Sequence, residues 1–132
     1  MSGININALS KSFPRKVISV LVILSLIFPG LAVSRAYHAN ILVKEVLVNR
    51  VGLGVIRFDV TELAGLAACA GSSAYKDAVL VDVNTKGGAL MTSLALTAKT
   101  SGQRVNVYGT GTCALDPGIA EDADYIHIIS AP

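Results

Sequence analysis

The stretch MTSLALTAKTSGQRVNVYGTGTC, from Met91 to Cys113, decides the fold class predicted for this chain. Its first half carries apolar residues at helical spacing, and Gly102 stands where a C′ glycine would end the helix. Val105 and Val107 then alternate with polar residues, a pattern typical of a half-buried β-strand. The stretch therefore predicts a helix, a glycine stop and a strand, and it ends on one of only two cysteines.

The predicted helix has two different faces. Its core stripe is expected to contain Leu90, Met91, Leu94, Ala95 and Ala98, with Thr92, Ser93 and Lys99 pointing away. Leu96 lies roughly opposite that stripe, and a single exposed leucine is ordinary on a protein surface. The alternative is that Ser93, Leu96 and Thr97, on a face with few charges, form an oligomer contact with a second copy of the chain.

Working outward from the helix, alternating or Val-rich segments predict three strands before it and two after it. The segment 61–77 is expected to be a loop with a helical turn, and 109–123 a second loop. The order of three strands, one helix and two strands is that of a mainly β, five-stranded OB-fold barrel, with an open α+β sandwich as the alternative. The five predicted strands cover residues 41–50, 55–60, 78–84, 104–108 and 125–129.

The N-terminal segment has the pattern of an export signal. Lys11, Arg15 and Lys16 precede the apolar run VISVLVILSLIF, and Ser34-Arg35-Ala36 places small residues where signal peptidase recognises them. A membrane anchor is the alternative, but the run is shorter than the roughly 20 residues needed to span a bilayer. We therefore expect residues 1–36 to be a signal peptide of the Gram-negative type, cleaved after Ala36. The remaining domain, 37–132, would be secreted or periplasmic.

Removing this segment changes the charge of the chain. Four of the 11 Lys and Arg residues lie in the predicted signal, which leaves seven basic against nine acidic residues and a net charge of −2. A nucleic-acid-binding protein needs a basic surface that faces phosphates, and no such stripe is visible. The composition therefore argues against a nucleic-acid partner.

Cys69 and Cys113 are an even pair in a chain expected to reach an oxidising compartment, so one intrachain disulfide is predicted. Closing a loop of this length would stabilise the fold by about 4 kcal/mol on the chain-entropy model. Free buried thiols and intermolecular bridges are the alternatives.

The sequence contains few groups suited to catalysis. Its only histidines are His38 and His127, and a hydrolytic site built from His127 and Asp124 lacks a nucleophile motif. The cysteine and histidine spacings match no zinc pattern. The acidic residues Glu121, Asp122 and Asp124 could attract calcium, although a solvated loop is the simpler interpretation. We therefore expect no enzymatic activity, no metal and no cofactor.

The helix ending in Ser101-Gly102, the strand Gln103–Tyr108, Cys113 and the terminal Tyr125–Ile128 segment together resemble a known family. They are similar to the B subunits of pentameric A–B toxins of the subtilase-cytotoxin and pertussis-like type, and the position of Cys69 suits that family's disulfide. The resemblance implies an OB-fold subunit that forms a ring, usually a pentamer, with its helices near a central pore. It also implies a cell-surface glycan as ligand and a toxin A subunit as partner.

Sugar sites favour aromatic platforms with fixed polar groups, yet the region after the signal has no Trp and few aromatics. These are Phe58, Tyr37, Tyr75, Tyr108 and Tyr125. No glycan-contact motif matches residue by residue, so the resemblance assigns no glycan-binding residue. The expected function is a secreted, non-enzymatic glycan-binding subunit. The alternative is a periplasmic structural or protein-binding OB-fold domain without a toxin role.

Overall fold

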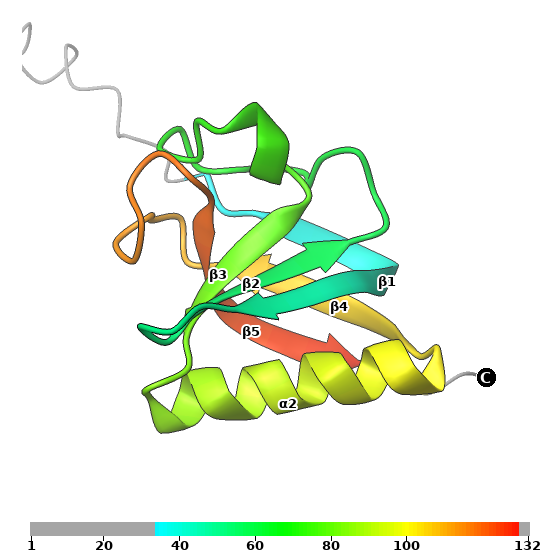
Figure 1. The fold of residues 1–132 in the computed structure, drawn as a ribbon. Helices are drawn as coiled ribbons and strands as arrows, with labels where there is room; N and C mark the ends of the chain where they lie inside the picture. The colour runs from blue at the N-terminus through cyan, green and yellow to red at the C-terminus, as the bar shows by residue number, and fades with distance from the viewer. Residues whose placement is uncertain (1–33, 130–132) are drawn as a thin grey trace, which may run out of the picture. The chain divides into compact units, whose positions relative to one another are not determined.

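The structure is a computed structural model that describes residues 34–129. Within them the chain is mainly β with one α-helix (Figure 1), and the predicted order of strand, strand, strand, helix, strand, strand is confirmed. Among the described residues a 3-10 turn, η2, spans Ser73–Tyr75 in the loop 61–77, where a helical turn was expected. The elements are β1 (Tyr37–Val48), β2 (Leu53–Phe58), β3 (Ala78–Asp82), α2 (Lys86–Ser101), β4 (Arg104–Gly109) and β5 (Glu121–Ile128).

The five strands close into a ring in the order β1-β2-β3-β5-β4, with β4 returning to β1. All pairs are antiparallel except β3 with β5, which run parallel. β1 pairs with β4 through Tyr37–Leu42 and with β2 through Val43–Val48. Its register with β4 shifts between His38 and Ile41, where Asn40 adopts a positive φ of 60°. This is the OB-fold arrangement. The closed ring excludes the open sandwich.

The core fills the inside of the ring. Each strand contributes alternate residues to it, because side chains on a strand point in turn to opposite faces. Ile56 and Phe58 on β2 are both 0% exposed, as the alternation of that strand predicts. The other core residues are Ala36, Ile41, Val43, Leu63, Val79, Val81, Ala95, Ala98, Val105, Val107 and Ile126.

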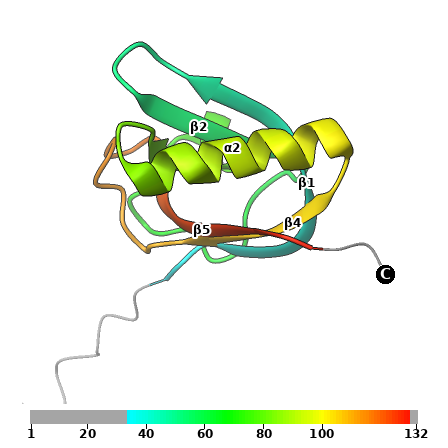
Figure 2. The same ribbon diagram turned by 90° about the horizontal axis from the view of Figure 1, so that it is seen from below.

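The helix α2 lies across one end of the ring, which is clear from the side and from below (Figures 1 and 2). Its first turn is capped by Thr85, whose hydroxyl accepts the Gly88 N–H at 3.0 Å. Gly102 ends it in the left-handed conformation, with φ of 66°, as the sequence predicted. Gly88 allows the helix to start close to β3, since a Cβ atom there would lie 1.9 Å from the carbonyl oxygen of Asp82.

Two residues of the helix were assigned to the wrong face, because Leu90 was expected in the core stripe and Thr92 outside it. Leu90 is 70% exposed, whereas Thr92 is buried. The buried face contains Gly88, Thr92, Ala95 and Ala98, small residues that let the helix approach the ring closely. Thr92 can be buried because its hydroxyl donates to the Gly88 carbonyl at 2.8 Å.

Several strand limits also differ from the prediction. β1 begins at Tyr37 rather than residue 41, because residues before the bulge pair with β4. β5 begins at Glu121 rather than 125, because Glu121 pairs with Val79 of β3. The acidic segment that we interpreted as a solvated loop is therefore the start of a strand, and its residues Glu121 and Asp122 are buried.

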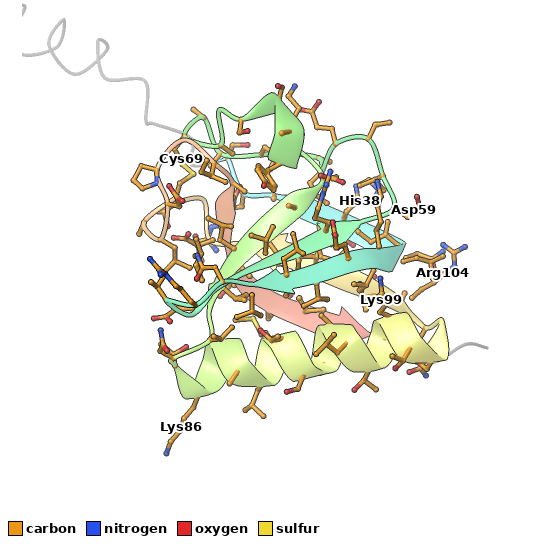
Figure 3. All side chains as sticks on the ribbon, in the orientation of Figure 1. His38, Asp59, Cys69, Lys86, Lys99 and Arg104 are labelled. Carbon is orange, nitrogen blue, oxygen red and sulfur yellow. A yellow bond between two sulfur atoms is a disulfide. The ribbon has the colours of Figure 1, made fainter. Side chains whose placement is uncertain are left out.

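The predicted disulfide between Cys69 and Cys113 is confirmed, with the two Cα atoms 5.9 Å apart. It joins the long β2–β3 loop, where Figure 3 labels Cys69, to the β4–β5 loop. This bond is consistent with an oxidising compartment.

Residues 1–33 of the predicted signal peptide lie outside the described residues. Of Ser34–Ala36, which we included in the signal, Ser34 and Arg35 are exposed and Ala36 is 1% exposed. Among residues 34–129, no helix has the length and apolar character needed to cross a membrane.

Candidate functional site

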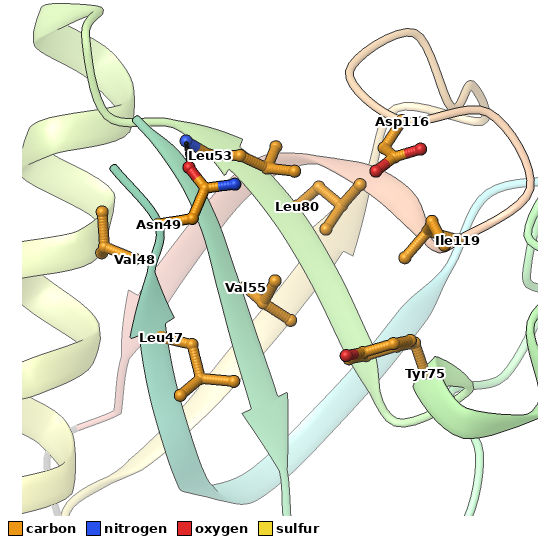
Figure 4. A pocket seen from close by; sticks show the side chains of 9 residues that line it. All are labelled: Leu47, Val48, Asn49, Leu53, Val55, Tyr75, Leu80, Asp116 and Ile119. Atoms are coloured by element: carbon orange, nitrogen blue, oxygen red, sulfur yellow. Dashed lines mark hydrogen bonds between the residues drawn. The ribbon is translucent and has the colours of Figure 1, made fainter. Parts of the chain in front are cut away.

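A pocket of about 310 Å³ lies on the outer face of the β1–β2–β3 part of the sheet (Figure 4). Its floor is apolar and its rim is formed by the β1–β2 turn and the β4–β5 loop. In OB-folds this face and these two connections are where oligosaccharides and oligonucleotides bind. We call it the sheet pocket; it is lined by Leu47, Val48, Asn49, Leu53, Val55, Tyr75, Leu80, Asp116 and Ile119.

The floor of the sheet pocket is a second hydrophobic cluster, separate from the core inside the ring. Leu80 and Ala78 of β3 are fully buried together with Ala120, and the partly buried Leu53 and Val55 pack on them. Both faces of β3 are therefore covered, which explains why all of Ala78–Val81 is buried. The outer cluster holds the pocket walls in fixed positions.

Tyr75 forms the aromatic wall of the sheet pocket. The guanidinium of Arg57 lies 5.7 Å from the centre of its ring, a cation–π contact, and also donates to the Ala74 carbonyl at 3.3 Å. Arg57 is in turn held by the carboxylate of Asp77, 3.0 Å away, whose hydrogen bonds raise the pKa of Arg57. The ring of Tyr75 is thus oriented by Arg57 and Asp77, two charged residues that do not line the pocket.

Asn49 stands on the rim, at the turn between β1 and β2. Its side-chain oxygen accepts the N–H groups of Val51 at 3.0 Å and Leu53 at 2.9 Å. Gly52 completes this turn with a φ of 89°. The amide nitrogen of Asn49 donates no hydrogen bond within residues 34–129, so it is available to a ligand.

Asp116 faces Asn49 across the pocket, from the β4–β5 loop (Figure 4). This loop is organised by Asp122, whose buried carboxylate accepts the N–H groups of Ala114 at 2.7 Å and Leu115 at 3.2 Å. The carboxylate of Asp116 has no hydrogen bond or ion pair among the described residues. The rim therefore offers one free amide donor and one free carboxylate acceptor above an apolar floor.

The charge of this region limits the ligands that fit. A second, more polar hollow of about 500 Å³ shares Asn49 and Asp116 with the sheet pocket and adds Asp82. No lysine or arginine lines either hollow. A ligand with a carboxylate or phosphate would meet Asp116 and Asp82 without a compensating cation, so an anionic ligand is disfavoured relative to an uncharged one.

The outer helix face is a second candidate surface, made of Ala89, Leu90, Ser93, Leu96, Thr97 and Thr100. Leu90 and Leu96 are 70% and 45% exposed, so the predicted exposure of Leu96 is confirmed. The hydroxyls of Ser93, Thr97 and Thr100 each donate to a carbonyl four residues earlier, at 2.9 Å. These polar groups are already satisfied by their own helix, so covering them with another protein surface would cost little. The charged Lys86 and Lys99 lie towards opposite ends of the helix (Figure 3).

Three of the four tyrosines form a ladder on strands β1, β4 and β5, which the sequence did not reveal. The ring centres of Tyr37 and Tyr108 are 4.5 Å apart, and those of Tyr108 and Tyr125 are 4.3 Å apart. Because these three residues are register partners, they meet on the same face of the sheet. The two outer rings, Tyr37 and Tyr125, are 43% and 46% exposed, and of the four tyrosines it is Tyr75 that lines the sheet pocket.

The histidines lie apart from both surfaces. His38 is half-buried in β1, and its Nδ1 has no hydrogen-bond partner among residues 34–129, whereas His127 is exposed in β5. No hydrogen bond within residues 34–129 joins His127 to Asp124. Of the acidic residues weighed as a calcium site, Glu121 and Asp122 bind backbone N–H groups and Asp124 is exposed. The described part of the chain contains no group of three or more potential metal ligands.

The residues of the sheet pocket were not predicted, because they come from turns and loops far apart in sequence. The sequence feature that could have indicated this pocket is the pair of turn motifs, Gly52–Gly54 and Asp116–Gly118. The OB-fold order of elements places both turns at one end of the sheet. Comparison of the chain with protein-family models, with curated proteins and with solved structures finds no match.

Proposed function

We propose that this chain is an exported, non-enzymatic binding domain whose sheet pocket holds an uncharged saccharide ring. The observation that carries the proposal is the combination of Tyr75, Asn49 and Asp116 around an apolar floor. A sugar ring has an apolar C–H face that packs on an aromatic ring and hydroxyls that bond to fixed amides and carboxylates. The position of this pocket on the ligand-binding face of an OB-fold supports the same assignment.

The acidic rim makes the proposal more specific than the resemblance to toxin B subunits. That resemblance allows sialylated glycans, which carry a carboxylate. With Asp116 and Asp82 at the rim and no basic residue in the lining, a neutral hexose is the better match.

We propose further that the domain forms a ring of identical subunits through the outer helix face. An exposed leucine pair with internally satisfied hydroxyls and few charges is suited to contact with a second copy. A catalytic A subunit is the partner that the resemblance implies, and a neighbouring gene for a secreted protease or ADP-ribosyltransferase would support it.

A glycan array that contains both neutral and sialylated oligosaccharides tests the ligand. We expect binding to neutral structures, and a rise in melting temperature when the matching monosaccharide is added to the protein. A well-folded protein that binds no glycan on the array would contradict the proposal.

A second candidate function is a protein-binding OB-fold domain with no toxin role. It is favoured by the apolar residues around the rim, since Leu47, Val48 and Val51 are 42%, 51% and 69% exposed. Apolar side chains gathered on a surface often mark a protein interface. A monomer on light scattering that retains one specific protein from periplasmic extract, and no glycan, would favour this candidate.

A further inference from the structure

Glu121 is fully buried, yet none of the ion pairs among the described residues includes it. Its carboxylate accepts backbone N–H groups instead, from Ala67 at 2.8 Å and from Gly111 at 2.6 Å. The third donor is Ala36, whose N–H lies 3.1 Å from each of the two carboxylate oxygens. A buried carboxylate needs every such partner, because the protein interior offers it no water.

These three donors belong to three separate segments of the chain. Ala67 lies two residues before Cys69, and Gly111 lies two residues before Cys113, so Glu121 binds both loops that the disulfide joins. Ala36 belongs to the segment before β1. Glu121 therefore fastens the start of the domain to the same point as the disulfide.

The segment before β1 makes further contacts with the ring. The carbonyl of Ala36 accepts the Gly109 N–H at 2.8 Å, which continues the pairing of β1 with β4. The hydroxyl of Ser34 donates to the Gly65 carbonyl at 2.7 Å. Ser34 and Ala36 are thus hydrogen-bonded to the folded domain.

From these contacts, and resting on the export proposed above, we propose that signal peptidase cuts this chain after Ala32 and leaves Ser34–Ala36 on the mature protein. A cut after Ala36 would remove both the N–H that binds Glu121 and the carbonyl that binds Gly109. The nitrogen of Tyr37 donates to the Ala64 carbonyl at 2.8 Å, and the described residues show no hydrogen bond from it to Glu121, so the new terminal amine would not lie where the lost donor was. Gly30 and Ala32 provide the small residues that signal peptidase needs three positions and one position before the cut.

The test is to express the full chain in a Gram-negative host, recover it from the periplasm and measure its intact mass. We expect the mass of a chain that begins at Val33 and contains the disulfide. A chain that begins at Tyr37 would overturn the inference while leaving the proposed export intact. An unprocessed chain that never reaches the periplasm would overturn the export as well, so the two failures are distinguishable.

A matched pair of variants locates the cut independently of how stable the product is. Ala32→Asp introduces a charge immediately before the proposed cut and is expected to abolish processing there. Ser34→Asp places the same charge three positions before the alternative cut, on a residue that is exposed in the domain, and is expected to leave the mature N-terminus at Val33. The reverse result, with Ser34→Asp blocking processing and Ala32→Asp having no effect, would contradict the inference.

Discussion

The buried carboxylate of Glu121 occupies the space in which residue 109 would carry a Cβ atom. A Cβ on Gly109 would lie 2.0 Å from Oε1 of Glu121 and 2.5 Å from its Cδ. Neither group can move easily, because the carboxylate is held by three backbone N–H groups and Gly109 is paired in β4. The glycine and the acid therefore depend on each other, although neither forms part of a recognisable motif.

Gly109→Ala is expected to destabilise the domain by about 3 kcal/mol, since overpacking a rigid site forces backbone shifts and loss of hydrogen bonds. Chemical denaturation measures the change. Gly87→Ala is the matched control: no atom lies within 4 Å of its added Cβ, and it sits in the first turn of α2. That variant is expected to be as stable as the parent or up to about 1 kcal/mol more stable. Equal destabilisation by both substitutions would refute the role given to Glu121.

Cys69→Ser is expected to lower the free energy of unfolding by about 2–5 kcal/mol, because it removes the bond that links the two loops. The parent protein treated with a reducing agent should show the same loss of stability, and the variant should show no further loss on reduction. A melting temperature that is the same for parent and variant would show that the disulfide does not stabilise the fold.

The spacing of apolar residues among polar ones was enough to predict the order of elements, because strands and helices differ in hydrophobic period. Ile56, Phe58, Val105 and Val107 all point into the core as that period requires. The face of the helix was harder to predict. Thr92 is buried because its hydroxyl is satisfied by the Gly88 carbonyl, a local bond that a hydrophobicity pattern does not contain.

The acidic residues at the start of β5 show a different limit. A sequence pattern indicates that Glu121 and Asp122 are charged, and charged residues are usually solvated. Their burial depends on backbone N–H groups of Ala36, Ala67 and Ala114, which only the closed ring brings near them. The sheet pocket depends on the same loops, and for that reason its residues could not be predicted before the fold was known.

The pKa of Tyr37 is expected to be raised above its ordinary value, chiefly by the neighbouring hydroxyl of Tyr108, which favours the protonated phenol. The interaction of Tyr37 with Tyr108 therefore stabilises the fold at pH values below the pKa of Tyr37 in the unfolded chain. This stabilisation is lost as the pH rises through the pKa of Tyr37 in the folded state. NMR titration with ¹³C-labelled tyrosine measures it. Tyr108→Phe should return the Tyr37 pKa towards its ordinary value, whereas Tyr125→Phe, which removes no group that bonds to Tyr37, should change it less.

Asp116→Asn is expected to weaken binding of a neutral saccharide by about tenfold, the loss that corresponds to one hydrogen bond to a charged acceptor. Tyr75→Ala should weaken it at least as much by removing the aromatic wall. Asp59→Asn is the matched control, because that carboxylate is exposed and lies outside the pocket lining. Isothermal titration with the best glycan from the array gives the three affinities. Unchanged affinity in both pocket variants would place the ligand elsewhere on the domain.

Leu96→Glu is expected to dissociate an oligomer into folded monomers, because it places a charge in the middle of the outer helix face. The fold should survive, since Leu96 is 45% exposed and does not belong to the core. Val51→Glu is the matched control: it adds the same charge to a residue that is 69% exposed in the β1–β2 turn. Light scattering reports the mass, and circular dichroism reports the fold. If the Leu96→Glu variant has the same mass as an oligomeric parent, the subunits meet through a surface other than α2. The hydroxyl bonds along that helix would then serve only to satisfy its own side chains.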